Sequence, residues 1–372
     1  MTHLFLFGTL CWPKLLQFVA GETCPEWEAA VLEGFQTSWA KGHNFPVIHQ
    51  AVAKSANGIL LLNCDAIVLA RLNHYESGFG YRLHPVTVQG PTGPVDAQVY
   101  LPPEGILAGR AWSLIDWVRD HGALASEAAL EVMAVLDHMT ASDMAQAYPM
   151  MRVRAASRLK ARAHPSPVSA SGLASNVVKV HKRKQPYTKF FALQEADMSV
   201  PRFDGGTEER VYRAGFLGTD VSIVLPYDPI RDRVLLVEQF RFGPFLRDDP
   251  NPWLMEPIAG RVDVGETPEM AAMREADEES GLALSALHKV HCGYASPGCS
   301  TEYFNTYVGI ADIDDDAAIL GGLEGEAEDI QGHILSFSDF LSLLKSGQLP
   351  VAPLALAGYW LALNRDVLRK NS

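Results

Sequence analysis

The chain has 372 residues, a length that is typical of two or three domains rather than one. Its formal net charge of −13 disfavours a nucleic-acid partner, because an acidic surface repels a phosphate backbone. Charge or proline interrupts every apolar run well before the roughly 18 residues that a membrane helix needs, so we expect no membrane span. Five scattered cysteines, without a CxxC pair, and the lack of a signal-peptide pattern predict reduced thiols in a cytoplasmic protein.

The N-terminal part of the sequence predicts short strands followed by helices. Compact apolar or alternating runs predict strands at 4–7, 58–62 and 85–88. Helical spacing continues from Asp65, a candidate N-cap, to His74. Two amphipathic helices are predicted at 111–121 and 126–139.

A change of composition separates the two halves of the chain. Residues 161–175 are rich in proline and serine, which is typical of a linker. Beyond them, the patterns predict strands at 177–180, 219–226, 233–238 and 303–310, and helices at 268–280 and 355–364. Strands and helices mix without strict alternation, so we predict an α+β fold rather than a doubly wound sheet.

The segment from Gly260 to Leu282 contains an acidic helix with clear end signals. Thr267 suits the N-cap, Pro268 suits the first helical position, and Gly281 suits a left-handed stop.

Three glutamates of this helix share one face. Glu275, Glu278 and Glu279 are three and four residues apart, near the C-terminal end where the helix dipole favours cations. A hard cation such as Mg²⁺ would remove their repulsion, since it binds carboxylate oxygens together with water and substrate phosphate. The alternative interpretation is a solvated acidic face.

The pattern Gly-x5-Glu-x7-Arg-Glu-x2-Glu-Glu-x-Gly, which begins at Gly260, resembles the Nudix box at every fixed polar and glycine position. The resemblance implies an α/β/α sandwich and a metal-dependent hydrolase that uses Mg²⁺, with Mn²⁺ as the alternative. It implies that Arg274 and Glu266 orient the glutamates, and that Glu279 is essential for catalysis. The implied metal ligands are Ala259 (through its carbonyl), Glu275, Glu278 and Glu279.

Further segments resemble the ADP-ribose pyrophosphatase branch of that family. They are Ser296-Pro297-Gly298 with the following Glu302, the strand motif 238–241, in which Arg241 would reach a substrate phosphate, and the acidic loop 322–330. The loop implies a mobile catalytic base, for which Glu326 is the first candidate and Glu328 the second, because metal-bound glutamates cannot also act as free bases.

The same resemblance extends to the segment 187–193, which is predicted as a strand that carries Phe191 against the adenine ring. It implies a homodimer that hydrolyses the pyrophosphate bond of ADP-ribose, or of a related nucleoside diphosphate sugar. Hydrolysis of ADP-ribose would give AMP and ribose 5-phosphate.

The N-terminal half resembles the gamma-glutamylcyclotransferase family, including its AIG2-like members, which implies a small β-barrel-like domain. Gly8, Thr9 and Leu10 follow the first strand and would line the substrate loop, and Glu76 would be the acid and base. Two positions depart from the family pattern: Phe7 stands where a tyrosine is usual, and Asn73 where an aspartate is usual.

The resulting organisation is an AIG2-like domain at 1–110, a helical extension at 111–160, a linker at 161–175 and a Nudix domain at 176–372. The combination resembles proteins associated with tellurite resistance in bacteria. Three functions remain open: an ADP-ribose pyrophosphatase, a bifunctional protein with gamma-glutamyl chemistry at Glu76, and a nucleotide-sensing regulator with a silent Nudix site.

Overall fold

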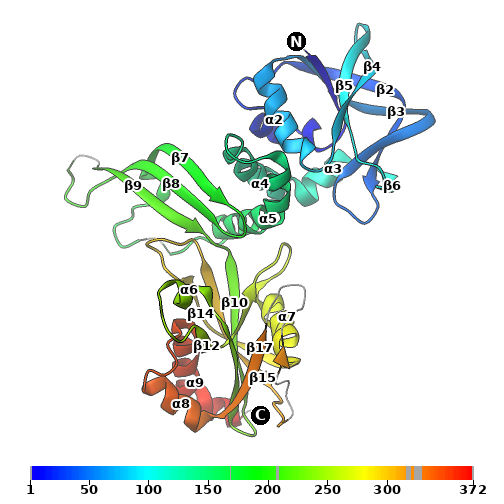
Figure 1. The fold of residues 1–372 in the computed structure, drawn as a ribbon. Coiled ribbons are helices and arrows are strands. Elements are labelled where there is room, and N and C mark those ends of the chain that lie inside the picture. Colours follow the sequence, from blue (N-terminus) through cyan, green and yellow to red (C-terminus); the bar gives the residue numbers. More distant parts are fainter. Residues whose placement is uncertain (1, 168, 207–208, 316–319, 322–328, 371–372) are drawn as a thin grey trace. The chain divides into compact units, whose positions relative to one another are not determined.

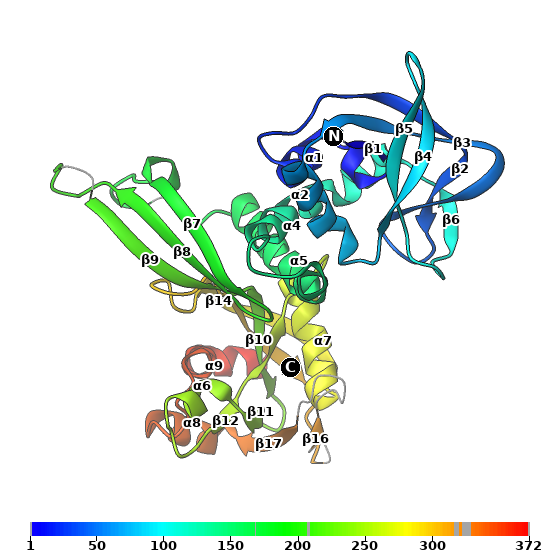
Figure 2. The same ribbon diagram turned by 45° about the horizontal axis from the view of Figure 1, so that its top comes forward.

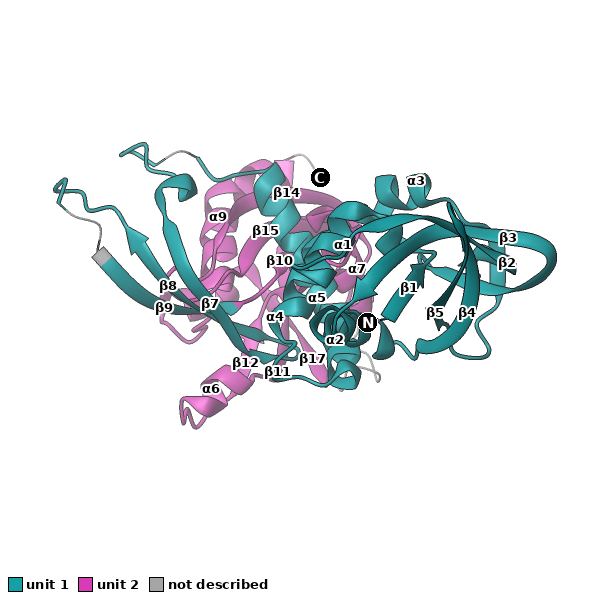
Figure 3. Ribbon diagram, turned by 90° about the horizontal axis from the view of Figure 1, so that it is seen from above, with its two compact units in different colours: residues 1–216 teal, residues 217–372 magenta. Residues whose placement is uncertain are grey.

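The structure, a computed structural model, describes residues 2–167, 169–206, 209–315, 320–321 and 329–370. The chain divides into two compact units, residues 1–216 (unit 1) and 217–372 (unit 2), which Figure 3 distinguishes by colour. Residues 176–216 therefore belong to unit 1, whereas the predicted domains place the boundary at 161–175. No described helix is long and apolar enough to cross a membrane. All five cysteines lie in the described ranges and are free thiols.

Unit 1 contains a closed five-stranded barrel (Figure 1). β1 (Thr2–Leu6) pairs antiparallel with β3 (Pro46–Cys64) and parallel with β5 (Gly93–Leu101). β5 pairs with β4 (Arg82–Gly90), β4 with β2 (Trp27–Ala40), and β2 with β3, which closes the ring. The short strand β6 (Ala108–Ala111) extends the sheet beside β2. The predicted strands fall in β1, β3 and β4, and the predicted barrel-like domain is confirmed.

Apolar side chains on both faces of β1 and β3 form the core of unit 1. Leu4, Phe5, Leu60 and Leu61 are fully buried, and they belong to one core with residues of the neighbouring helices. Full burial of such side chains is worth about 1.5–3 kcal/mol each. This core therefore fixes the end of β1, after which the predicted substrate loop begins.

Helices follow and flank the barrel. They are the 3₁₀ turn η1 (Thr9–Cys11), α1 (Pro13–Ala20), α2 (Ala66–Ser77), α3 (Leu114–Trp117), the π-helical turn η2 (Val118–Gly122), α4 (Ala123–Ala134) and α5 (Ala141–Ala163). Asp65 caps α2 as predicted, since its Oδ1 accepts a hydrogen bond from the Val68 amide at 2.8 Å. The helix predicted at 111–121 is instead α3 followed by η2, and α5 runs into the predicted linker as far as Ala163.

A separate three-stranded sheet ends unit 1. Its strands β7 (Lys179–Thr188), β8 (Ala192–Val200) and β9 (Glu209–Leu217) are ordered β7-β8-β9 (Figure 2). The prediction of one strand through 187–193 was wrong, because Lys189, Phe190 and Phe191 form the turn between β7 and β8. The carbonyls of Lys189 and Phe190 bond to the Arg154 side chain of α5 rather than to a neighbouring strand.

Unit 2 is built on a mixed sheet ordered β14-β15-β10-β11-β17-β16, with β12 added to β11 and β13 to β10. Its strands are β10 (Asp220–Asp228), β11 (Arg233–Phe240), β12 (Trp253–Glu256), β13 (Ile258–Arg261), β14 (Leu284–Tyr294), β15 (Tyr303–Ala311), β16 (Leu320–Gly321) and β17 (Ile330–Ser336). Its helices are α6 (Phe242–Leu246), α7 (Pro268–Ser280), α8 (Phe337–Lys345) and α9 (Ala352–Lys370).

The helices of unit 2 cover both faces of this sheet. Val224 belongs to a core that includes Ala272 and Ala276 of α7, whereas the next residue, Leu225, belongs to a core with α8 and α9. Successive strand residues point to opposite faces, so the two cores lie on opposite sides of the sheet. Figures 1 and 2 show the strands between α7 and α9. This arrangement is the predicted α/β/α sandwich.

Candidate functional site

The acidic helix α7 has the ends that its sequence predicts. The Thr267 hydroxyl accepts a hydrogen bond from the Met270 amide at 3.2 Å, and Gly281 adopts the left-handed φ of 65°. Ala272 and Ala276 are fully buried on the side that faces the sheet. The packed alanines therefore set the position of the helix against the sheet.

The Arg274 side chain forms ion pairs with three carboxylates of the Nudix box. Its Nε lies 2.8 Å from Glu266 Oε1, and its Nη1 lies 2.7 Å from both Glu275 Oε1 and Glu278 Oε2. Its Nη2 donates to the carbonyl oxygen of Arg261 at 3.0 Å and to Glu266 Oε2 at 3.1 Å. The contacts with negative charge raise the pKa of Arg274 above its usual value. One guanidinium thus holds three carboxylates together and attaches them to the end of β13.

Gly260 makes room for one of these carboxylates. A Cβ atom at Gly260 would lie 1.8 Å from Glu275 Oε1, so only glycine leaves the carboxylate its present place. Gly260 follows Ala259 on β13, where Ala259 pairs with Ile223 of β10. The predicted ligands Glu275 and Ala259 are therefore brought together by close packing of α7 on β13.

Glu279 is the most buried of the three predicted ligand glutamates. Glu279 is 4% exposed, although glutamate seldom occurs at such burial without a compensating charge. Within the described ranges, no three acidic, histidine or cysteine side chains are spaced as a metal centre. The donor chemistry nevertheless suits a hard divalent cation, since all the predicted ligand atoms are oxygens and two carboxylates already converge on Arg274 Nη1.

Arg241 lies directly after β11 and caps α6. Its Nε and Nη2 bond to Glu256 Oε1 and Oε2 at 2.6 and 3.0 Å, a two-point ion pair. Glu256 is itself buried on β12. The predicted role of Arg241 in binding phosphate stays a prediction, and in this structure the guanidinium is oriented by Glu256.

The loop between β14 and β15 contains the predicted Pro297 and Glu302. Pro297 is exposed, and the Glu302 amide donates to the Ser300 hydroxyl at 3.1 Å. Burial raises the pKa of the Glu302 carboxyl. Glu302 packs against Gly218, where a Cβ would lie 3.0 Å from the Glu302 Cβ. The two predicted catalytic bases, Glu326 and Glu328, lie outside the described residues.

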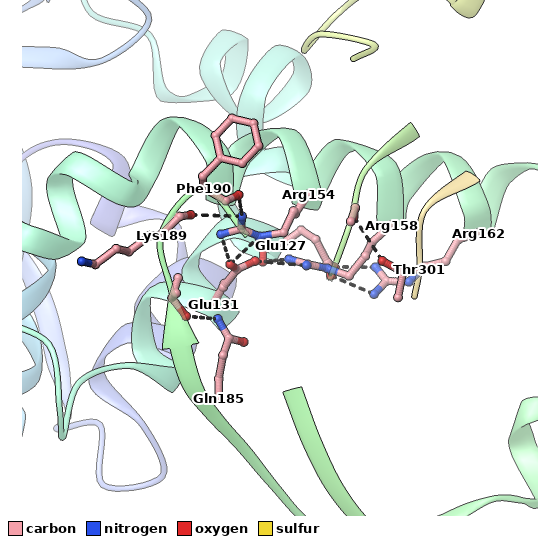
Figure 4. Close-up of polar contacts among 11 residues, drawn as sticks. Glu127, Glu131, Arg154, Arg158, Arg162, Gln185, Lys189, Phe190 and Thr301 are labelled. Atoms are coloured by element: carbon pink, nitrogen blue, oxygen red, sulfur yellow. Dashed lines mark hydrogen bonds and ion pairs between the residues drawn. The ribbon is translucent and has the colours of Figure 1, made fainter. Parts of the chain in front are cut away.

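Phe191 lies at the exposed turn between β7 and β8 in unit 1. Its side chain is 53% exposed and meets the Phe190 ring edge to face at 4.8 Å. Arg154 Nη1 donates to the carbonyl oxygens of Phe190 at 2.9 Å and Lys189 at 3.4 Å. Figure 4 shows this guanidinium between the turn and Glu131. The predicted contact of Phe191 with adenine stays a prediction.

A cavity of about 320 Å³ in unit 1 contains the predicted cyclotransferase residues. Gly8, Thr9, Leu10 and Glu76 all line it. Gly8 is tightly packed, since a Cβ there would lie 2.6 Å from the Pro46 Cγ. The cavity thus assembles the end of β1 and the C-terminal part of α2, which are far apart in sequence.

Glu76 lies among aromatic side chains in this cavity. Burial raises the pKa of its carboxyl to about 7. Two tyrosines of the same wall are held by their hydroxyl groups: Tyr81 donates to the Pro46 carbonyl at 3.0 Å, and Tyr100 donates to Asn73 Oδ1 at 2.8 Å. A carboxyl group with this pKa changes its protonation near neutral pH, as an acid–base group must.

Comparison with known proteins assigns the C-terminal half. The family model described as the NUDIX domain matches residues 217–354. The ADP-ribose pyrophosphatase of Escherichia coli (strain K12) is 34% identical over 194 residues, which cover 52% of this chain and 92% of that enzyme. The ADP-ribose pyrophosphatase of Haemophilus influenzae is 33% identical over 187 residues, which cover 50% of this chain and 86% of that enzyme.

The chain belongs to the Nudix family of hydrolases.

The similarity extends beyond the compact C-terminal unit of this Nudix hydrolase. The match to the Escherichia coli enzyme is longer than unit 2, so it includes residues before Leu217. A GDP-mannose pyrophosphatase of Cronobacter sakazakii is also similar, with 31% identity over 173 residues that cover 46% of this chain and 87% of that enzyme.

A second family model, described as gamma-glutamyl cyclotransferase, AIG2-like, matches residues 4–119. Both predicted family resemblances are therefore confirmed. The Nudix hydrolase carries an AIG2-like barrel, followed by helices that extend beyond the matched residues.

Several residues that line the cavity of unit 1 could not be identified from the sequence. His121, Tyr148 and Arg152 line the cavity from η2 and α5, yet their segments carry no motif. The helical spacing alone could not identify them, because their role depends on which side of each helix meets the barrel. Glu256 could not be identified either, because its role follows from an ion pair with Arg241, which lies on another element.

Proposed function

We propose that the Nudix unit hydrolyses the pyrophosphate bond of ADP-ribose to AMP and ribose 5-phosphate. The observation that carries the proposal is the cluster around Arg274, in which Glu266, Glu275 and Glu278 meet beside the buried Glu279. The names of the Escherichia coli and Haemophilus influenzae relatives support ADP-ribose as the substrate.

One set of residues would bind the metal ion, and another would bind the substrate. Glu275, Glu278, Glu279 and the Ala259 carbonyl would hold Mg²⁺ or Mn²⁺. Such a cation supplies electrophilic activation of a phosphoryl oxygen and lowers the pKa of water. Arg274 keeps the carboxylates in position, and Gly260 leaves space for Glu275.

Other parts of the chain would recognise the substrate. Arg241, oriented by Glu256, would bind a phosphate, and Phe191 would stack on adenine. Pro297 and Glu302 would border the site, and Glu326 or Glu328 would act as the base. We further propose that the enzyme is a cytoplasmic homodimer, as the resemblance to this branch implies.

The test is ADP-ribose turnover with Mg²⁺, with AMP and ribose 5-phosphate identified as products. We expect Glu279→Gln to lower ADP-ribose turnover at least about 100-fold. Loss of a predicted metal ligand should cost at least as much as the roughly 10- to 100-fold loss that is typical when a residue supporting a ligand is replaced. Asp277→Asn is the matched control, because Asp277 is exposed on the same helix and loses the same charge. Equal activity of wild type and Glu279→Gln would refute the proposal.

The substrate is tested separately from the site. ADP-ribose, ADP-glucose, NADH, FAD and GDP-mannose are compared at equal concentration, since one group of relatives is named for GDP-mannose. We expect the highest kcat/KM for ADP-ribose. A higher value for another compound would replace the substrate while leaving the hydrolytic site in place.

A second activity is supported by the cavity in unit 1. There Glu76 would take a proton from the α-amine of a gamma-glutamyl compound as the amine nitrogen attacks the γ-carbonyl carbon. The new C–N bond closes 5-oxoproline, the original C–N bond breaks, and Glu76 returns the proton to the departing amine. Release of 5-oxoproline from gamma-glutamyl peptides should disappear in Glu76→Gln. Absence of release from the wild type would end this second proposal.

A further inference from the structure

The cavity of unit 1 is completed by residues from outside the AIG2-like segment. The family match ends at residue 119, whereas five lining residues come from later positions in η2, α4 and α5. These are His121, Leu124, Ala125, Tyr148 and Arg152. The chemistry of one side of the pocket is therefore specific to this chain's helical extension.

Arg152 differs from the other arginines of its helix. Arg154, Arg158 and Arg162 all form ion pairs with Glu127 or Glu131 of α4 (Figure 4). Within the described part of the chain, no hydrogen bond or ion pair engages Arg152, which lines the cavity instead.

The other described titratable groups that line the cavity carry no full negative charge at pH 7. Burial lowers the pKa of His121, so that imidazole is neutral at pH 7. The buried tyrosines are neutral as well, and burial keeps Glu76 partly protonated near that pH. An unpaired guanidinium beside an apolar wall is a strong binding position for an anion, because the charge-assisted hydrogen bond replaces lost hydration.

The rest of the lining restricts the ligand. The wall is largely aromatic and includes Phe7, Phe79, Tyr81, Tyr100 and Trp117. A volume of about 320 Å³ corresponds to roughly ten water molecules, so it accepts an organic molecule of roughly ten to fifteen non-hydrogen atoms. One guanidinium balances one negative charge, whereas a phosphate dianion would leave its second charge unpaired against this wall.

We propose that this pocket binds a small organic monocarboxylate, with the carboxylate held by Arg152 and the apolar body against the aromatic wall. Arg152 is then the residue that determines specificity for the anionic group. The inference concerns binding alone, and it stands whether or not Glu76 transforms a bound molecule.

The test uses matched pairs of an acid and its amide, which have the same shape and differ in charge. 3-Phenylpropionate is compared with 3-phenylpropanamide, and hexanoate with hexanamide, by titration calorimetry on the full chain. The variants are Arg152→Gln, Arg152→Lys and the control Arg82→Gln, since Arg82 is exposed on β4 outside the cavity.

We expect the wild type and Arg82→Gln to bind at least one acid tenfold or more tightly than its amide. Arg152→Gln should reduce that preference to less than twofold, and Arg152→Lys should restore part of it. Unchanged circular dichroism and unchanged urea unfolding show that each variant is folded. No binding of either acid by the wild type, or an undiminished preference in Arg152→Gln, would overturn the proposal.

Discussion

At the scale of single residues, two positions show how the environment decides what a side chain can do. Gly260 matters because it lacks a side chain, which leaves the Glu275 carboxylate its place over β13. Glu76 matters because its carboxyl lies in an apolar cavity, where the charged form is penalised. Neither property belongs to the residue type alone.

Replacement of Gly260 by alanine should impair catalysis while preserving the fold. The added Cβ would lie 1.8 Å from Glu275 Oε1, and the flexible glutamate side chain would move away from it. We expect ADP-ribose turnover to fall at least about tenfold, the lower limit for disturbed ligand positioning. Gly243→Ala in α6 is the control, since no atom lies within 4 Å of its Cβ position. Unchanged turnover in Gly260→Ala would show that Glu275 does not depend on this space.

Glu76 should make unit 1 less stable as the pH rises. Its folded pKa of about 7 exceeds the ordinary 4.5, so the folded state holds the proton more tightly than the unfolded state does. The associated stability is fully present below pH 4.5 and is lost as the pH rises through 7, by up to about 3 kcal/mol.

The measurement is urea unfolding of the wild type and Glu76→Gln between pH 4.5 and 8. Glutamine does not titrate, so the variant should lose this part of the pH dependence. If both proteins lose the same stability over that interval, another group is responsible.

At the scale of elements, α5 connects the helical extension to the turn that carries Phe191. Arg154 is 1% exposed and pairs with Glu131, which is 3% exposed, while donating to the carbonyls of Lys189 and Phe190. A buried ion pair of this kind does not by itself raise stability, yet removal of one partner leaves an uncompensated charge. The position of the β7–β8 turn therefore depends on a side chain of α5.

Arg154→Met should destabilise unit 1 by about 3–5 kcal/mol, because Glu131 would remain buried after losing its main partner. Amide hydrogen exchange at residues 187–193 should accelerate as the turn loses its anchor. Arg158→Met is the control, since its side chain is 31% exposed and screened by solvent. Exchange at the turn that is unchanged in Arg154→Met would argue against anchoring by α5.

At the scale of the whole molecule, the Arg274 cluster and the Glu76 cavity belong to different compact units. The Arg274 cluster lies in unit 2, and the Glu76 and Arg152 cavity lies in unit 1. The two sites share no side chain, so substitutions in them should act independently.

This independence is tested with the single and double variants of Glu279→Gln and Arg152→Gln. We expect Glu279→Gln to abolish ADP-ribose hydrolysis while changing the affinity for 3-phenylpropionate by less than twofold. Arg152→Gln should show the reverse, and the double variant should combine both effects. Loss of hydrolysis in Arg152→Gln at normal stability would instead indicate that occupancy of the cavity regulates the Nudix unit.

Local sequence was sufficient for the features that depend on neighbours along the chain. Thr267, Pro268 and Gly281 predicted the bounds of α7, and the spacing of its glutamates predicted a shared face. The Nudix box likewise predicted its family, because its fixed residues are close together in sequence, and two short separate segments resembled the AIG2-like family.

Only the tertiary structure decided which distant residues meet. It placed Glu256 against Arg241, turned Phe191 out of the predicted strand, and brought Arg152 to the cavity that contains Glu76. The physical reason is that an amphipathic pattern predicts a helix and its buried side, whereas the partner of that side depends on packing between elements.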